Sequence, residues 1–215
     1  MKKALLLFIL IIQFAVLGQK QPPFQGRLIY KIEFINPVDS TQNTISKSVI
    51  YTNDTLVRIE SETGQLGPQV LIKHLVLQKY YLLINYNDTK FAIQQHVPKD
   101  TIPSKYTFKK KLGSKKIAGV KAKRVLVSAP SYDRAIELWY FPKISPKYLD
   151  VMKGIKGLPV DYYLQLEDGM LHYTLENIEF SAVNKDLFGI PTDFKKVSFD
   201  EFLDQMMQLQ PEIKE

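Results

Sequence analysis

The stretch Arg27-Leu28-Ile29-Tyr30-Lys31-Ile32-Glu33-Phe34 sets the pattern that decides the fold. Successive side chains of a β-strand point to opposite faces, so a half-buried strand carries an apolar residue at every second position. Here Leu28, Tyr30, Ile32 and Phe34 share one face, charged residues occupy the other, and Asn36-Pro37 ends the segment. The stretch therefore predicts a strand with one face in a core.

The same alternation returns along the chain, between polar turn clusters such as Asn53-Asp54, Gly67-Pro68 and Asn87-Asp88. Such regular spacing favours a large antiparallel sheet or barrel over a parallel α/β fold. The fold class is predicted to be mainly β (α+β). Further strands are predicted at residues 46–53, 55–62, 69–77, 79–86, 90–95, 106–112, 120–129, 135–141, 160–167 and 170–180.

Two helices interrupt this pattern. Ser145-Pro146 and Lys153-Gly154 carry the start and stop signals of a short helix of about two turns. Near the C-terminus, Ser198-Phe199-Asp200-Glu201 is a capping box, in which the serine oxygen and the glutamate carboxylate each satisfy a free backbone amide. The apolar residues after it fall at intervals of three and four, which predicts an amphipathic helix whose stripe covers something. The stripe consists of Phe199, Phe202, Leu203, Met206 and Met207.

The N-terminus has the features of a secretory signal. Met1-Lys2-Lys3 precedes an apolar run from Ala4 to Leu17, and we expect cleavage near Gly18. The alternative, an uncleaved membrane anchor, requires about 20 apolar residues, more than this run offers. We therefore predict a signal peptide at 1–18 and a single domain at 19–215, periplasmic or extracellular and without a transmembrane anchor.

Composition narrows the partners further. The chain has no cysteine, which excludes disulfides and a lipid anchor on an N-terminal cysteine. The formal net charge of +7 falls to +5 once Lys2 and Lys3 are removed. This mild positive charge favours anionic surfaces slightly and does not indicate nucleic acid.

Several predicted strands are apolar on both sides. Leu71, Leu75 and Leu77 alternate with Val70, Ile72 and Val76, and the segment Tyr80–Ile84 is apolar throughout. Such strands need both faces covered. Protein can cover both faces, or a ligand can fill a concave side, and the sequence leaves both alternatives open because core and pocket linings are chemically alike.

A search for catalytic motifs finds no nucleophile elbow, no phosphate-binding glycine loop and no His-Glu-x-x-His. His74, His96 and His172 have no second histidine or carboxylate at ligand spacing. We expect a structural pair of His172 with Glu176, which would share a strand face. The sequence thus predicts a protein that is not an enzyme and has no cofactor or metal.

The segment from Lys105 to Arg124 holds nine basic residues and no acidic one. It predicts a patch for anionic head groups or polysaccharide. The alternative is that lysines on exposed strands keep sheet edges from pairing with other molecules, which the alternation of Tyr106 and Phe108 with polar residues fits. The candidate patch consists of Lys109, Lys111, Lys121, Lys123 and Arg124.

Four short segments in the second half of the chain, from Lys116 onward, carry a resemblance to a known family. They are Lys116–Lys123, Glu137–Phe141, Lys156–Val160 and Leu187–Pro191. In order and spacing they resemble the exported domain-of-unknown-function family DUF4412, which is similar in fold to the lipoprotein carriers LolA and LolB. Exported proteins named for a Gly-Leu-Pro-Gly-Leu-Ile motif are a weaker match, since Val160-Asp161 stands where Gly-Leu would be. The basic character of residues 105–124 departs from the family pattern.

The resemblance implies a strongly curved antiparallel sheet or incomplete barrel, with a short helix after Ser145 and the C-terminal helix closing its concave side. It brings no catalytic residues and no transport activity by itself. We expect an exported binding protein of the cell envelope that holds a lipid, a lipoprotein or another apolar ligand. The alternative is a structural or protein-interaction module with a solid core, whose partner is an envelope protein. Candidate ligand-binding residues are Tyr30, Leu82, Trp139, Phe199, Phe202 and Met206.

Overall fold

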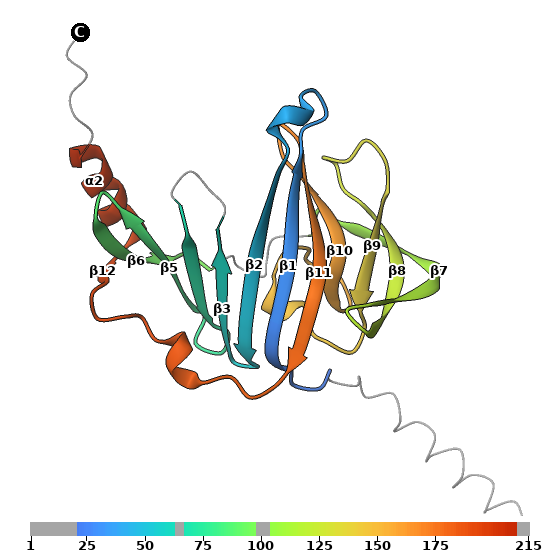
Figure 1. Cartoon of the computed structure of the whole chain (residues 1–215), viewed down its shortest axis with the longest axis horizontal. Helices are drawn as coiled ribbons and strands as arrows, with labels where there is room; N and C mark the ends of the chain where they lie inside the picture. Colours follow the sequence, from blue (N-terminus) through green and yellow to red (C-terminus); the bar gives the residue numbers. More distant parts are fainter. Residues whose placement is uncertain (1–20, 63–66, 98–103, 210–215) are drawn as a thin grey trace, which may run out of the picture.

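The computed structural model describes residues 21–62, 67–97 and 104–209, and these build one 12-stranded sheet (Figure 1). The sheet order is β12-β6-β5-β4-β3-β2-β1-β11-β10-β9-β8-β7. The strands are β1 (Gln25–Ile35), β2 (Thr44–Asn53), β3 (Leu56–Ser61), β4 (Gln69–His74), β5 (Lys79–Tyr86), β6 (Thr89–Gln95), β7 (Thr107–Ile117), β8 (Val120–Ser128), β9 (Ile136–Phe141), β10 (Leu158–Gln165), β11 (Met170–Phe180) and β12 (Lys195–Val197).

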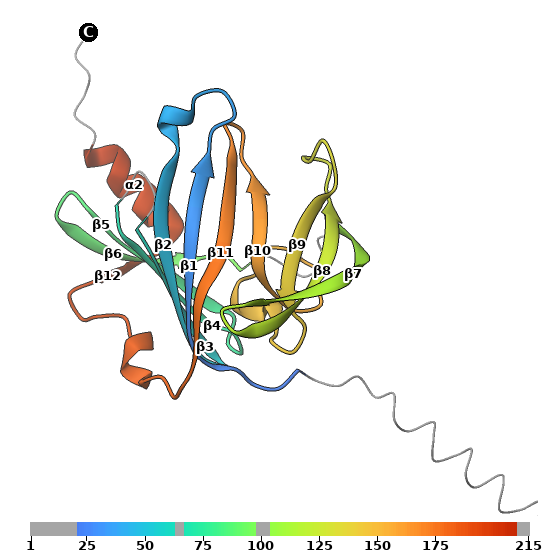
Figure 2. The ribbon, with the colours of Figure 1, turned by 45° about the vertical axis from the view of Figure 1, so that its right-hand side comes forward.

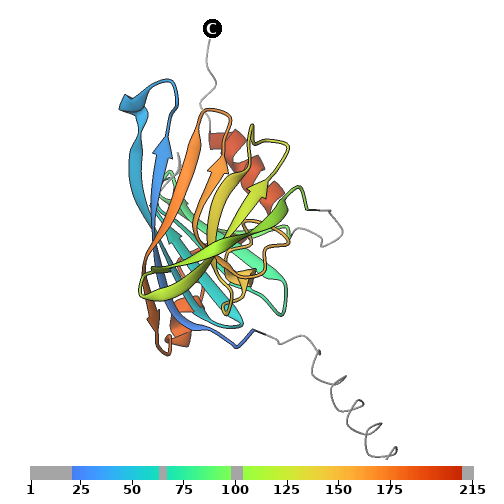
Figure 3. The ribbon, with the colours of Figure 1, turned by 90° about the vertical axis from the view of Figure 1, so that its right-hand side faces the viewer.

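The predicted fold class is confirmed. The sheet is strongly curved (Figure 3). It is also open, because its two edge strands, β7 and β12, do not pair with each other. Neighbouring strands pair antiparallel, with one exception that was not predicted: the three residues of β12 run parallel to β6. The predicted signal peptide at 1–18 lies outside the described residues. Within the described ranges, no helix combines the length and apolar character needed to cross a membrane.

The short helix after Ser145 is smaller than predicted. It is the single 3₁₀ turn η3 (Pro146–Tyr148), and the Lys147 amide donates to Ser145 Oγ at 3.4 Å as the capping signal requires. Asp150 then takes a positive φ of 57°, which a helix does not allow. The apolar residues that follow, Met152 and Ile155, are buried in the main core. Burial in the core, and not local helix propensity, therefore determines the backbone conformation of this segment.

The C-terminal helix is confirmed as α2 (Phe199–Leu209). Its capping box forms as predicted: the Ser198 amide donates to Glu201 Oε2 at 2.7 Å, and the Glu201 amide donates to Ser198 Oγ at 3.1 Å. Two further 3₁₀ turns, η2 (Ser40–Gln42) and η4 (Lys185–Phe188), lie in connecting segments.

The predicted strand at 69–77 is too long. β4 ends at His74, and Leu75–Gln78 form a turn in which Val76 is 69% and Leu77 is 58% exposed. Gln78 takes a positive φ of 51°, which reverses the chain towards β5. The prediction that residues 75–77 continue the strand, with Leu75 and Leu77 on one face, is therefore wrong.

The main core lies on the concave face, where the chain between β9 and β10 folds back inside the curve (Figure 2). We call residues 142–157 the plug segment. Its side chains pack against β1, β2, β3 and β8 to β11, which removes a large apolar area from water. The deeply buried members are Ile144, Tyr148, Met152 and Ile155.

β5, one of the strongly apolar strands, has buried side chains on both faces that other parts of the protein cover. Ile84 of β5 packs under α2, in a cluster with Phe91, Ile93 and Phe202. Its neighbour Leu83 points to the opposite face, where Ile190 and Phe194 of the segment before β12 lie over it. The sequence-based inference that these strands have two buried faces is confirmed for β5.

Lysines occupy both edges of the sheet. β7 is exposed along most of its length and carries Lys109, Lys110, Lys111, Lys115 and Lys116, while β12 begins with Lys195-Lys196. Charged side chains on an edge strand oppose pairing with another molecule. The edge position of β7 supports the edge-protection interpretation of the basic segment.

Candidate binding site on the concave face

A pocket of about 140 Å³ lies on the concave face, between the sheet and the plug segment. Its floor comes from β1, β2, β3, β10 and β11, and Leu149 and Val151 of the plug segment form one wall. The volume is close to the ~150 Å³ of a dry apolar cavity that binds benzene, and it is smaller than a pocket for a drug-sized ligand. The pocket can take a compact group or one end of a longer ligand.

Three tyrosines line one side of this pocket. The rings of Tyr162 and Tyr173 stack with centroids 4.8 Å apart, and Tyr30 meets Tyr162 edge-on at 6.4 Å. The Tyr30 hydroxyl donates to the Pro159 carbonyl at 2.7 Å. Burial raises the pKa of Tyr30 and of Tyr162 far above the usual value, so both phenols stay protonated and keep a hydrogen to donate.

Tyr162 differs from Tyr30 in one respect. Its side chain is fully buried, and its hydroxyl has no hydrogen-bond partner among the described residues. Leaving such a group unpaired costs about 1–3 kcal/mol. Nearby, the hydroxyls of Ser48 and Ser61 lie 3.3 Å apart and form a pair on the pocket lining.

A buried lysine connects the sheet to the plug segment next to the pocket. Lys73 pairs across the strands with Val57 and is 2% exposed, and its ammonium donates to Asp150 Oδ2 at 3.4 Å. Burial lowers the pKa of this ammonium, an effect that Asp150 opposes. Asp150 stands between the pocket residues Leu149 and Val151, so this ion pair positions the wall of the pocket.

The helix α2 covers the far end of the concave face. The Phe202 ring lies 5.3 Å from that of Phe91 and 6.4 Å from that of Tyr86, both edge-on. The rest of the apolar stripe is only partly covered, because Phe199 is 42%, Leu203 is 40% and Met207 is 66% exposed. Apolar surface on α2 is thus left in contact with solvent.

The predicted ligand-binding residues divide into four groups. Tyr30 lines the pocket, whereas Leu82, Phe202 and Met206 lie together in the α2 cluster. Phe199 remains half exposed at the start of α2. Trp139 points away from its buried neighbour Leu138; its indole N–H donates to Glu137 at 2.8 Å, and Lys115 Nζ lies 4.5 Å from the ring centroid.

The predicted basic patch lies on the β7–β8 hairpin. Four residues of the patch are exposed: Lys109, Lys111, Lys121 and Lys123. Arg124 is partly buried, and its guanidinium is hydrogen-bonded within the protein. The Arg124 guanidinium donates to the Leu112 carbonyl at 2.7 Å and to Glu137 at 3.1 Å. It thereby holds the bulge of β7 between Lys110 and Ser114. By register and alternation, Lys109 shares the face of Arg124, and Lys121 and Lys123 lie on the other face.

The expected pair of His172 with Glu176 is wrong. His172 Nε2 lies 2.9 Å from Asp161 Oδ1 and Nδ1 lies 3.4 Å from Glu33, while Glu176 pairs with Lys47 at 3.7 Å. Residues four apart on one strand are separated by about 13 Å, so neighbours on adjacent strands are closer. Burial raises the pKa of Asp161, but hydrogen bonds from His172 and Lys115 outweigh it and leave that pKa lowered.

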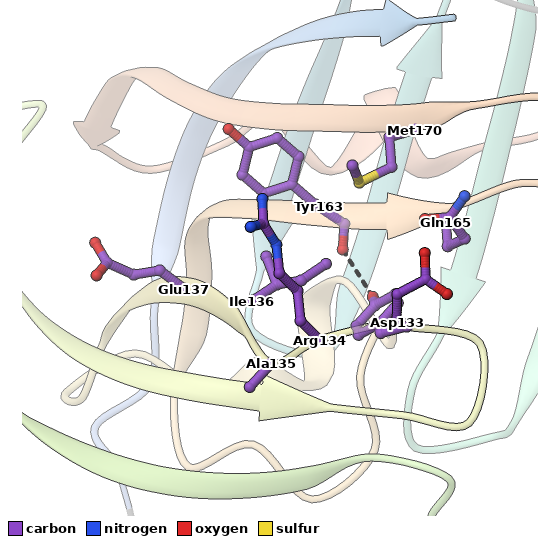
Figure 4. Close-up of a pocket in the computed structure, with 9 residues that line it drawn as sticks. Asp133, Arg134, Ala135, Ile136, Glu137, Tyr163, Gln165 and Met170 are labelled. Carbon is purple, nitrogen blue, oxygen red and sulfur yellow. Dashed lines mark hydrogen bonds between the residues drawn. The ribbon is translucent and has the colours of Figure 1, made fainter. Parts of the chain in front are cut away.

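A second, wide pocket of about 820 Å³ was not predicted from the sequence (Figure 4). It lies where β9 pairs with β10 only through residues 139–141, so that the start of β9 separates from the end of β10. The Tyr132 hydroxyl bridges this separation by donating to the Tyr163 carbonyl at 2.9 Å. The lining of this second pocket includes the charged side chains of Asp133 and Arg134 and the apolar side chain of Met170. Strand divergence is a tertiary feature with no signal in the local sequence.

Neither the family models nor the curated proteins contain a match to this sequence. The resemblance to the family DUF4412 is therefore not confirmed. Among solved structures, a LolA superfamily protein from Nitrosomonas europaea is similar over 79% of this chain and 91% of that chain, with 7% sequence identity and a TM-score of 0.37.

Proposed function

We propose that this protein is an exported, non-catalytic binding protein of the cell envelope that holds an apolar ligand on the concave face of its sheet. The supporting observation is the pocket beside the plug segment, which interrupts an otherwise packed core and combines apolar walls with few polar groups. Small-molecule sites commonly have this composition.

A path of apolar residues leads from the pocket towards α2. Ile59 lines the pocket and pairs with Leu71, which in turn pairs with Leu82 beside the α2 cluster. All three side chains are partly exposed. A long lipid chain does not fit in about 140 Å³, so it would extend along this path with α2 as its lid.

Replacing Ser61 by phenylalanine is expected to block the pocket, because Ser61 lines it and the new ring would occupy most of its volume. Ser61→Ala removes the same hydroxyl and leaves the space open. Titration of residues 19–215 with a fluorescent fatty acid should give at least about tenfold weaker binding for Ser61→Phe, because the ligand loses its contacts with the apolar walls of the pocket. Ser61→Ala should stay within about twofold. Equal binding by the wild type and a folded Ser61→Phe variant would place the ligand elsewhere.

The second candidate function is a structural or protein-interaction module without a small ligand. The plug segment favours this candidate, because Tyr148 is fully buried. Its hydroxyl accepts a hydrogen bond from the Phe24 amide at 3.1 Å and donates one to Asp54 Oδ1 at 2.6 Å. A chain that fills its own concave face so well needs no ligand for stability. Recovery of an envelope protein with purified, lipid-free protein would support this candidate.

We also propose that the exposed lysines of the β7–β8 hairpin meet anionic lipid head groups. Each lysine near an anionic membrane contributes about 1 kcal/mol. The double change Lys109→Glu with Lys111→Glu should therefore weaken binding to vesicles containing phosphatidylglycerol by at least about tenfold. Lys185→Glu with Lys196→Glu changes the net charge equally, in η4 beside β3 and in β12 at the opposite edge of the sheet, and should have little effect. A sedimentation assay measures both, and equal loss in both would show that only net charge matters.

A further inference from the structure

We infer that the wide pocket between β9 and β10 binds an extended peptide segment of another protein, which pairs as an added strand with the backbone of β10 at Tyr163 and Gln165. The peptide carries apolar side chains at alternate positions. This inference goes beyond the proposed function, because the wide pocket and the concave pocket have no lining residue in common.

The first argument is the direction of the backbone groups on β10. The Leu166 amide donates to the Gly169 carbonyl at 2.8 Å, so these two residues form a hydrogen-bonded pair of the β10–β11 hairpin. Hydrogen-bonded and non-hydrogen-bonded pairs alternate along an antiparallel ladder, so the backbone N–H and C=O groups of Gln165 and Tyr163 point away from β11. The Tyr132 hydroxyl agrees with this direction, since it reaches the Tyr163 carbonyl from the side of β9 at 2.9 Å.

The second argument is that these backbone groups face a strand edge with no neighbour. The pairing of β10 with β9 stops at Asp161, so no strand of the described chain pairs with Tyr163 or Gln165 on that side. Across the pocket, Ile136 and Glu137 pair with β8 alone. Figure 4 shows Tyr163 and Gln165 on one side of the pocket and Ile136 and Glu137 on the other. An unpaired strand edge is a template for a further strand, and many peptide-binding domains use it in this way.

The third argument is that this inner edge lacks the protection of the two outer edges. β7 and β12 carry lysines, which oppose pairing with another chain. β10 has no charged residue from Tyr162 to Gln165, the part that lies beyond its pairing with β9. The Gln165 side chain is exposed, so solvent reaches this edge. The pocket volume of about 820 Å³ lies within the range of about 300–1,000 Å³ that is typical of ligand-binding clefts.

The side chains around the pocket determine the pattern of the peptide. By register and alternation, Tyr163, Gln165 and Glu137 lie on one face of the sheet. Ile136 and Leu164 lie on the other face, where both pack against the main core. Successive side chains of an added strand would meet these two surfaces in turn. The residues that point towards the core are therefore apolar, and those between them are polar.

The experiment selects random heptapeptides displayed on phage against the wild-type protein (residues 19–215) and measures the affinity of the enriched sequences as synthetic peptides. Gln165→Pro removes the amide that faces the pocket and no hydrogen bond to β11, and strands tolerate proline where their N–H side is unpaired. Gln165→Ala changes the side chain and keeps the amide. We expect Gln165→Pro to bind an enriched peptide at least about tenfold more weakly than the wild type, and Gln165→Ala to stay within about threefold.

Two further measurements make the result independent of how well Gln165→Pro folds. Binding of the peptide should slow hydrogen exchange of the Gln165 amide in the wild type. Methylation of alternate backbone nitrogens of the peptide, in one register or the other, should abolish binding, because an added strand needs its own N–H groups.

The inference is wrong if no peptide is enriched on the wild type. It is also wrong if the enriched peptides bind Gln165→Pro as tightly as the wild type, or if Gln165→Ala loses as much affinity as Gln165→Pro, since side-chain contacts would then hold the peptide. Titration with chitotetraose tests a sugar as the alternative occupant. NMR shifts at Tyr163 and Gln165 with this sugar, and with no peptide, would overturn the inference.

Discussion

Replacing Gly157 by alanine is expected to lower the free energy of unfolding by at least about 3 kcal/mol. A Cβ at this position would lie 2.3 Å from the Phe141 carbonyl oxygen and 2.7 Å from a ring carbon of Tyr140. The first contact is with backbone, which a change of side-chain rotamer does not relieve. The end of the plug segment would have to move away from β9, and the core around Leu158 would open.

Gly189→Ala is the matched control. Its backbone has a φ of −75°, which any residue adopts, and the nearest atom to an added Cβ is the Asp186 carbonyl oxygen at 3.3 Å. We expect a change within about 1 kcal/mol there. Urea denaturation of both variants measures the difference, and similar midpoints for the two would mean that the plug segment is not packed against β9 as described.

The second large effect is expected for Phe202→Ala. Phe202 is 4% exposed and contacts the rings of Phe91 and Tyr86, so its truncation should cost about 3–5 kcal/mol locally. Because α2 holds to the sheet through this cluster, the loss should detach the helix and leave the rest folded. Amide hydrogen exchange should then rise in α2 and at the paired residues of β6 and β12.

Phe199→Ala makes the same chemical change one helical turn earlier, at a side chain that is 42% exposed. It should cost no more than about 1 kcal/mol and leave exchange in β6 unchanged. If α2 is the lid of the concave site, Phe202→Ala should also speed ligand release, while Phe199→Ala should not. Equal exchange in the two variants would argue against Phe202 as the anchor of α2.

The strands and α2 could be predicted because their signals are local. Alternation with period two marks a half-buried strand, and the Ser198 to Glu201 capping box fixes a helix start from four residues. The 3₁₀ turn at Pro146 could not be predicted. Its capping residues fit a helix, but burial of Tyr148 and Met152 against distant strands decides the backbone. The parallel pairing of β12, three residues long, likewise depends on where α2 docks.

The pocket was predictable only as one of two alternatives. Apolar residues on both sides of β5 require cover, but their pattern is the same whether a helix or a ligand provides it. For β5 the cover is α2 on one face and Phe194 on the other. The open space lies instead beside Tyr30 and Tyr162, because the plug segment leaves it there. Alternation separates Trp139 from Leu138, yet it does not reveal which of them faces the concave side.

The central claim is that the concave face holds an apolar ligand, and native mass spectrometry of the mature protein, purified without detergent, tests it most directly. The account predicts a second mass species that solvent extraction removes and that is identified as a lipid or other apolar molecule. It also predicts that the extracted protein binds a fluorescent fatty acid. A single apo mass, together with no fatty-acid binding by the folded protein, would contradict it.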